Sequence, residues 1–127
     1  MDIDKIRNTL MKLGRSKVKF IILFGSMVNK RNTPLSDVDV AVYYDGNKKE
    51  RFKFRIEASG NLPDKVDLQI FQDLPLYIQK EVIAGRILYY DNYQFIFNEF
   101  MRIIKDFDSF EKYYQEYLNG LKEGVAA

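Results

Sequence analysis

The chain has 127 residues and a mass of 15.0 kDa, which suits one domain, and its 46% apolar residues are enough for a folded core. Twenty Lys and Arg against eighteen Asp and Glu leave a net charge of +2, which does not mark a nucleic-acid-binding protein. Without cysteine or histidine, the chain has no disulfide, thiolate or histidine catalysis, so its chemistry rests on carboxylates, hydroxyls, Lys, Arg and a hard cation such as Mg²⁺.

Hydrophobic spacing predicts the first elements in chain order. Residues 3–13 form an amphipathic helix that Gly14 ends. Residues 18–24 are short, apolar and rich in strand-forming types, as expected for a strand buried on both faces. A short helix over residues 27–31 then leads to a second strand from Asp37 to Tyr44, in which Asp and Val alternate.

The next segment is basic and helix-like. Residues 48–59 form a helix, and the spacing of Phe52, Ile56 and Ser59 places these three side chains on one side. The run Lys48–Arg55 mixes cations with aromatic rings, a composition that also occurs in RNA-binding segments. Helix geometry gives the simpler interpretation, with Phe52 and Ile56 turned inward and the charges in water. We therefore expect no nucleic-acid partner.

A third strand, a helix and a fourth strand follow. Residues 65–71 alternate, so that Asp67 and Gln69 face away from the apolar side chains of the same strand. A helix extends from Asp73 to Gly85, and residues 86–90 form a short strand. The order of elements predicts an α/β fold, with helices packed on a short mixed sheet.

The rest of the chain is helical. From Tyr93 onward the apolar spacing predicts one long helix, or two with a break near residues 108–109. Two roles are open for one apolar stripe of this segment: it covers the sheet or the first helix, or it contacts a partner protein. The stripe consists of Phe97, Phe100, Ile104 and Phe107.

We expect a single domain over residues 1–127, with an α/β core at 1–90 and a C-terminal helical extension at 91–127. The first five residues are acidic and lack the pattern of a signal peptide. The longest strongly apolar run, residues 20–24, is far too short to span a bilayer. A cytoplasmic protein without membrane contact is therefore expected.

Gly25 and Ser26 directly follow the first buried strand and precede the predicted short helix. Such a junction offers free backbone N–H groups and the positive end of a helix to a phosphate. Gly25 permits close approach, and the Ser26 hydroxyl adds a hydrogen bond. By itself, however, a Gly-Ser pair after a strand indicates a turn and no more.

Asp37 and Asp39 are two residues apart on a predicted strand, so their carboxylates lie on the same face. Like charges so close repel, and aspartate is a poor strand former. The pair forms either a solvated edge or a site for a divalent cation. If the strand of Asp67 pairs beside it in register, three carboxylates converge and suit two Mg²⁺ ions about 3.5–4 Å apart.

These residues also form a known pattern. Gly25-Ser26, ten residues and then Asp37-Val38-Asp39 match the GS-x10-D-x-D motif, which arises by chance in about one chain per thousand of this length. The chain therefore resembles the DNA polymerase β-type nucleotidyltransferases. Within them it resembles the minimal nucleotidyltransferase (MNT) branch, and more narrowly the MntA-type antitoxins of HEPN/MNT toxin–antitoxin pairs.

The resemblance implies a nucleotidyltransferase fold with a magnesium site. In it, Asp37 and Asp39 bind Mg²⁺ and Asp67 is the third acidic residue, while Gly25 and Ser26 hold the phosphates of the nucleotide. The implied reaction transfers AMP from ATP to a tyrosine of a HEPN toxin, a ribonuclease, and so silences it.

The chain departs from its relatives directly after the Gly-Ser pair. Relatives commonly carry a small residue, Arg and Gly there, whereas this chain has Val28-Asn29-Lys30-Arg31. Lys30 or Arg31 is then the candidate for the phosphate contact, and solvated surface charges are the alternative.

Three functions remain to be separated. The first is nucleotidyl transfer to a protein hydroxyl. The second is a non-catalytic antitoxin or nucleotide-binding regulator that acts by occlusion. The third is transfer to a small molecule, which is disfavoured because so short a chain has little to enclose such an acceptor. The clustered carboxylates favour an enzyme, since a purely occluding protein has no need of them.

Overall fold

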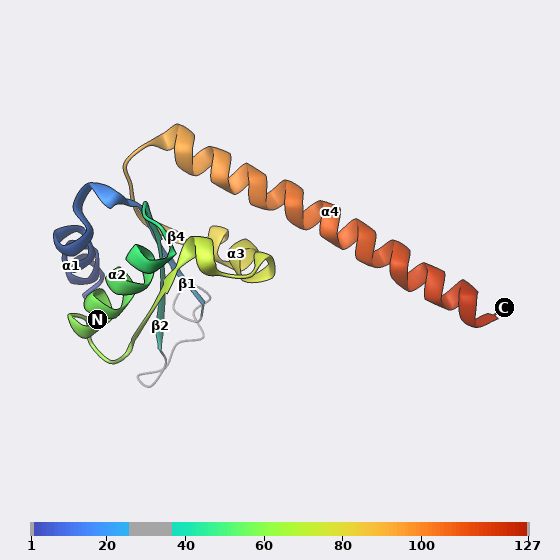
Figure 1. Cartoon of the computed structure of the whole chain (residues 1–127), viewed down its shortest axis with the longest axis horizontal. Coiled ribbons are helices and arrows are strands. Elements are labelled where there is room, and N and C mark those ends of the chain that lie inside the picture. The colour runs from blue at the N-terminus through green and yellow to red at the C-terminus, as the bar shows by residue number, and fades with distance from the viewer. Residues whose placement is uncertain (1, 26–36, 127) are drawn as a thin grey trace.

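The computed structural model describes residues 2–25 and 37–126, with side chains as far as 121. The described residues form both helices and strands, as Figure 1 shows. In chain order the elements are α1 (Ile3–Gly14), η1 (Arg15–Lys17), β1 (Val18–Phe24), β2 (Val38–Tyr44), α2 (Lys48–Gly60), β3 (Val66–Ile70), η3 (Phe71–Asp73), α3 (Leu76–Ile83), β4 (Arg86–Tyr90) and α4 (Tyr93–Ala126).

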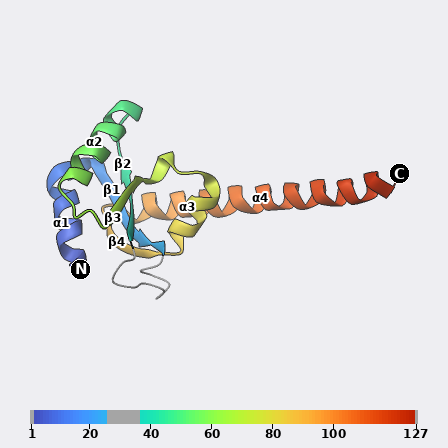
Figure 2. The same ribbon diagram turned by 90° about the horizontal axis from the view of Figure 1, so that it is seen from below.

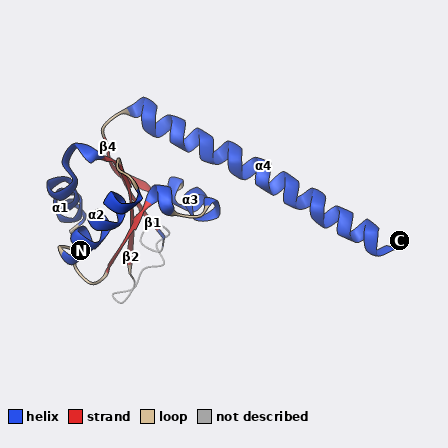
Figure 3. Cartoon of the chain, in the orientation of Figure 1, coloured by secondary structure: helices blue, strands red, loops and turns tan. Residues whose placement is uncertain are grey.

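The four strands form one mixed sheet in the order β3-β2-β1-β4 (Figure 3). β1 pairs antiparallel with both β2 and β4, whereas β2 and β3 are parallel. Parallel neighbours need a crossover, and α2 supplies it between β2 and β3. The sheet confirms the predicted α/β fold, and the bounds of β1 and β4 are those predicted from the sequence.

Each face of the sheet has its own hydrophobic core. α1 and α2 cover one face, where their apolar side chains meet Val38, Val40 and Val42 of β2. α3 and the first half of α4 cover the other face, where they meet Phe20 and Ala41. Figure 2 shows the two groups of helices on either side of the strands. The described part of the chain is therefore a three-layer structure with the sheet in the middle.

The predicted inner face of α2 is wrong. Phe52 and Ile56 are 62% and 57% exposed, while Phe54 and Ala58 are buried. Phe54 stacks on the ring of Tyr44 with centroids 4.3 Å apart, and the small Ala58 side chain lets the helix approach the sheet closely. Both pairs have the same four-residue spacing, and the contact with Tyr44 favours the pair that contains Phe54.

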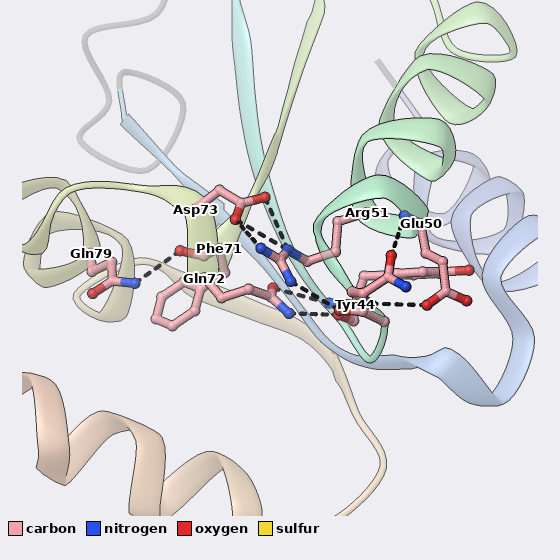
Figure 4. Close-up of polar contacts among 9 residues, drawn as sticks. Tyr44, Glu50, Arg51, Phe71, Gln72, Asp73 and Gln79 are labelled. Carbon is pink, nitrogen blue, oxygen red and sulfur yellow. Dashed lines mark hydrogen bonds and ion pairs between the residues drawn. The ribbon is translucent and has the colours of Figure 1, made fainter.

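Two cations of the basic run on α2, Arg51 and Arg55, contribute contacts to the fold, and Figure 4 shows those of Arg51 with Asp73. The Arg51 guanidinium donates to Asp73, with Nη2 to Oδ1 at 2.8 Å, and to the carbonyl of Gly46 at 2.9 Å. Arg55 donates to the carbonyl of Leu68 at 3.0 Å and so occupies an acceptor of the edge strand β3. These contacts tie the ends of β2 and β3 to α2.

The C-terminal half differs from the predicted boundaries in two places. Asp73 belongs to the 3-10 turn η3, and α3 begins only after Pro75, its N-cap. α4 is one helix of 34 residues without a break at 108–109. Its predicted apolar stripe is divided: Phe100 packs on the second core, whereas Phe97 is 45% exposed. No helix in the described residues is long and apolar enough to cross a membrane.

A matched pair of variants tests the orientation of α2. Phe54→Ala leaves a cavity beside Tyr44, and we expect it to lower the free energy of unfolding by about 3–5 kcal/mol. Phe52→Ala removes an exposed ring and should change it by no more than about 0.5 kcal/mol. Urea unfolding monitored by circular dichroism measures both. Equal losses from the two variants would contradict the observed orientation.

Candidate functional site

The parallel register of β2 and β3 brings two predicted site residues together. Asp39 and Asp67 are direct partners across the two strands, and neighbouring strands lie about 4.8 Å apart. Both side chains are on the face of the sheet that carries Ala41 and the second core, because the valines next to Asp39 face α1 and α2. The site therefore lies near the end of the sheet where β2 and β3 begin.

The glycine of the predicted turn lies at the same place. β1 runs antiparallel to β2, and its last residue, Phe24, is the partner of Asp39. Gly25 follows with φ of 79°, a conformation that L side chains rarely adopt. A Cβ atom at this position would collide with Oδ2 of Asp39. The backbone conformation therefore favours glycine here, and a side chain at this position would displace the Asp39 carboxylate from its observed place.

Burial and neighbouring charge raise the pKa of Asp39. The largest cause is its partial burial, followed by repulsion from Asp67, then from Asp37, and then from Glu81. Burial and neighbouring negative charge therefore destabilise the carboxylate form of Asp39 relative to its protonated form. A cation beside it would remove that penalty, because it attracts the charged form.

Asp67 and Asp37 are more accessible than Asp39. Asp67 is exposed and accepts a hydrogen bond from Nε2 of Gln69 at 2.9 Å. Asp37 is exposed directly before β2 begins. Within the residues that the structure describes, no three carboxylates are grouped tightly enough to hold a metal ion as they stand. The backbone brings the three aspartates near enough for Asp67 and Asp37 to act electrostatically on Asp39.

The other predicted phosphate ligands cannot be placed. Ser26, Lys30 and Arg31 lie outside the described residues, as does the short helix predicted over 27–31. Gly25 is the last described residue before this segment.

Two residues near the site were not singled out from the sequence. Gln69 shares a face with Asp67, and the two-residue alternation of β3 was the signal that it is a neighbour. Glu81 lies on α3, and its charge acts on Asp39. No sequence spacing predicts that Glu81 comes near Asp39, because this proximity depends on how α3 packs over the sheet.

The donor set fits magnesium. Carboxylate oxygens are the side-chain ligands that Mg²⁺ prefers, and Asp39 on β2, Asp67 on β3 and Asp37 directly before β2 could supply them. The repulsion acting on Asp39 is the electrostatic condition that a divalent cation relieves. Together with the adjacent Gly25 turn, the arrangement suits a nucleotide whose phosphates lie beside a metal-binding pair.

Comparison with known proteins identifies the family of the chain. Residues 4–94 match the Polbeta family, described as polymerase beta, nucleotidyltransferase. The protein MJ1547 of Methanocaldococcus jannaschii, provisionally named a protein adenylyltransferase, is 31% identical over 108 residues. That alignment covers 85% of this chain and 79% of MJ1547.

The fold is shared with chains of solved toxin–antitoxin complexes. A chain from a toxin–antitoxin structure with AMP-PNP matches with a TM-score of 0.74 at 18% identity, covering 95% of this chain and 99% of that chain. A chain from the complex of the tri-AMPylated Shewanella oneidensis HEPN toxin with MNT antitoxin matches with a TM-score of 0.66 at 19% identity, covering 94% and 98%. At these identities the likeness establishes the fold.

Replacement of Gly25 tests the contact with Asp39. Gly25→Ala adds a methyl group that collides with the carboxylate and strains the backbone, so we expect a loss of about 1–3 kcal/mol in the free energy of unfolding. Gly60→Ala is the control, because its added Cβ meets no atom within 4 Å; it should not lower stability. Thermal unfolding of both variants measures the difference. A Gly25→Ala protein as stable as the parent would refute the close contact.

The raised pKa of Asp39 predicts that removal of its negative charge increases the stability of the protein, by an amount that depends on pH. A carboxyl whose pKa is higher in the folded than in the unfolded protein loses stabilisation as pH rises through the folded pKa. In EDTA at neutral pH, Asp39→Asn should therefore be more stable than the parent by about 0.5–1 kcal/mol, a small gain because solvent screens a half-exposed group. The difference in Tm should shrink as the pH is lowered through that pKa. A difference that stays constant with pH would contradict the assignment.

Proposed function

Because the chain belongs to the polymerase beta nucleotidyltransferase family, we propose that it transfers AMP from ATP to a tyrosine of a HEPN ribonuclease toxin. The modification neutralises the toxin, so the chain acts as an antitoxin. The observation that carries the proposal is the pairing of Asp39 with Asp67 beside Gly25. The name of MJ1547 and the AMPylated toxin in a complex of the same fold support this choice of reaction.

Three aspartates would hold Mg²⁺ in this function. Asp39 supplies the half-buried ligand, and Asp37 and Asp67 supply exposed ones on either side of it. When bound, two Mg²⁺ ions would neutralise charge on the triphosphate. Gly25 and Ser26, with Lys30 or Arg31, would hold the phosphates of the nucleotide at the end of β1.

The transfer step needs a base near the acceptor. The tyrosine oxygen forms a bond to the α-phosphorus of ATP, and the bond from this phosphorus to the bridging oxygen breaks, so that pyrophosphate leaves with the electron pair. The proton of the tyrosine hydroxyl passes to the carboxylate of Asp67. Asp67 suits this role because it is exposed toward an arriving protein and is oriented by Gln69 at 2.9 Å.

The proposal is tested with a HEPN ribonuclease toxin as the acceptor protein. The full chain is incubated with Mg²⁺, ATP and that toxin, and the intact masses of both proteins are measured. We expect AMP to be added to the toxin and peptide mapping to place it on tyrosine. Asp39→Asn and Asp67→Asn should each lower the rate at least about 100-fold, because each removes a ligand of the cation. Asp4→Asn, on α1 at the other face of the sheet, should stay within about twofold.

The same experiment separates the alternatives. If the chain forms a stable complex with the toxin and the toxin gains no AMP, the chain neutralises the toxin by occlusion and not by AMP transfer. Transfer that survives in Asp39→Asn would show that the carboxylates do not hold the cation. Loss of transfer on removal of Mg²⁺ by EDTA, with recovery when Mg²⁺ is restored, is the expected behaviour of the parent.

A further inference from the structure

α4 carries an apolar seam with an unbroken coiled-coil spacing. Eight large apolar or aromatic side chains follow one another at alternating intervals of four and three residues, the repeat that packs one helix against others. The seam consists of Ile96, Phe100, Ile103, Phe107, Phe110, Tyr114, Tyr117 and Leu121.

The two halves of this seam have different surroundings. In the inner half, Ile96 and Ile103 are at most 4% exposed within the second core, and Phe107 lies under Lys80 of α3 at 4.1 Å. The outer half projects away from the sheet in both views (Figures 1 and 2). There the exposed fraction rises to 48–58% for the outer seam, which we define as Phe110, Tyr114, Tyr117 and Leu121.

This exposure requires an explanation beyond local folding. An isolated helix gains nothing from a continuous apolar seam in water, whereas burying large side chains is the main source of binding free energy. Leu118 and Tyr113, on either side of the outer seam, are also exposed and widen the patch. Neighbouring apolar residues on one projecting helix are typical of a surface that another molecule covers.

Charge next to the outer seam indicates which molecule that is. Residues 106–121 contain four acidic side chains, Asp106, Asp108, Glu111 and Glu116, against the single basic Lys112. Asp106 and Glu111 directly flank seam positions, although Asp106 also lies 3.3 Å from Arg102. A second copy of α4 would bring an equally acidic border against this one, and an anionic lipid surface would be repelled in the same way.

The aromatic side chains further restrict the partner. Tyr114 and Tyr117 occupy seam positions where two closely packed helices prefer aliphatic residues. Tyrosine is instead common at protein interfaces, where its ring is buried and its hydroxyl reaches a polar rim. A groove between two helices accommodates such rings better than a single facing helix does.

We propose that the outer seam of α4 docks into an apolar groove between helices of a different protein, and that Lys and Arg side chains border this groove. This inference concerns a surface separate from the aspartates and does not depend on the proposed reaction. The inner half of the seam anchors the docking helix in the core of the domain, so the outer half is presented on a rigid element.

Two synthetic helical hairpins serve as probes of this surface. Both have a leucine-lined groove; one has lysine along the rims and the other glutamate. Using fluorescence anisotropy with the full chain, we expect the lysine hairpin to bind at least about tenfold more tightly than the glutamate hairpin, and its affinity to fall with added salt. In sedimentation velocity the chain alone should be monomeric.

Matched variants locate the binding. The double variant Tyr114→Glu, Tyr117→Glu should weaken binding of the lysine hairpin at least about tenfold. The control Lys112→Gln, Asn119→Glu makes the same change of net charge on the opposite side of the helix and should stay within about threefold. Tyr114→Ser, Tyr117→Ser adds no charge and should also weaken binding. Far-UV circular dichroism verifies that every variant keeps its helix.

Three results would overturn the proposal. Equal weakening by the seam and control variants would mean that net charge alone drives the binding. Equal binding of both hairpins, or of neither, would refute the basic rim. A dimer of the chain alone that the Tyr114→Ser, Tyr117→Ser variant abolishes would make a second copy the occupant.

Discussion

The candidate site depends on the register between β2 and β3. Side chains alternate along a strand, so a slip of one residue would move Asp67 to the opposite face and remove it from Asp39. What fixes the register is apolar: Val66, Leu68 and Ile70 are buried on the face covered by α1 and α2. Each contributes about 1.5–3 kcal/mol, and together they exceed the roughly 3–4 kcal/mol by which two like charges repel across neighbouring strands at an effective dielectric constant of about 20. The hydrophobic core thus holds together carboxylates that would otherwise separate.

The space for the Asp39 carboxylate is provided by β1, which pairs with β2 on the side opposite to β3. The antiparallel pairing of β1 ends with Phe24 opposite Asp39, and the absence of a side chain at Gly25 leaves the carboxylate its position. Partial burial and the charges of three other carboxylates then raise the pKa of Asp39. Burial and neighbouring negative charge favour the protonated form of Asp39. A cation bound beside the aspartates would favour the carboxylate form instead, because it attracts the negative charges.

The sequence predicted what depends on nearby residues and missed what depends on distant ones. The bounds of β1 and β4 were predictable because apolar runs end at turn-forming residues, and Asp37 and Asp39 were paired by their spacing alone. α2 was turned the wrong way because Phe52 with Ile56 and Phe54 with Ala58 offer the same periodicity, and only the ring of Tyr44 selects between them. Glu81 was missed because its proximity to Asp39 arises from the packing of α3.

The openness of the site bears on how an acceptor is chosen. Asp67 is exposed, so the residues around it have little surface with which to discriminate one hydroxyl from another. Selection must then come from contacts made elsewhere, and the projecting half of α4 offers apolar surface anchored to the domain that carries the aspartates. A partner docked there would be tethered to the domain that carries the aspartates, which makes its encounter with the site intramolecular. Taken together, the two proposals place recognition on a helix and chemistry on the sheet.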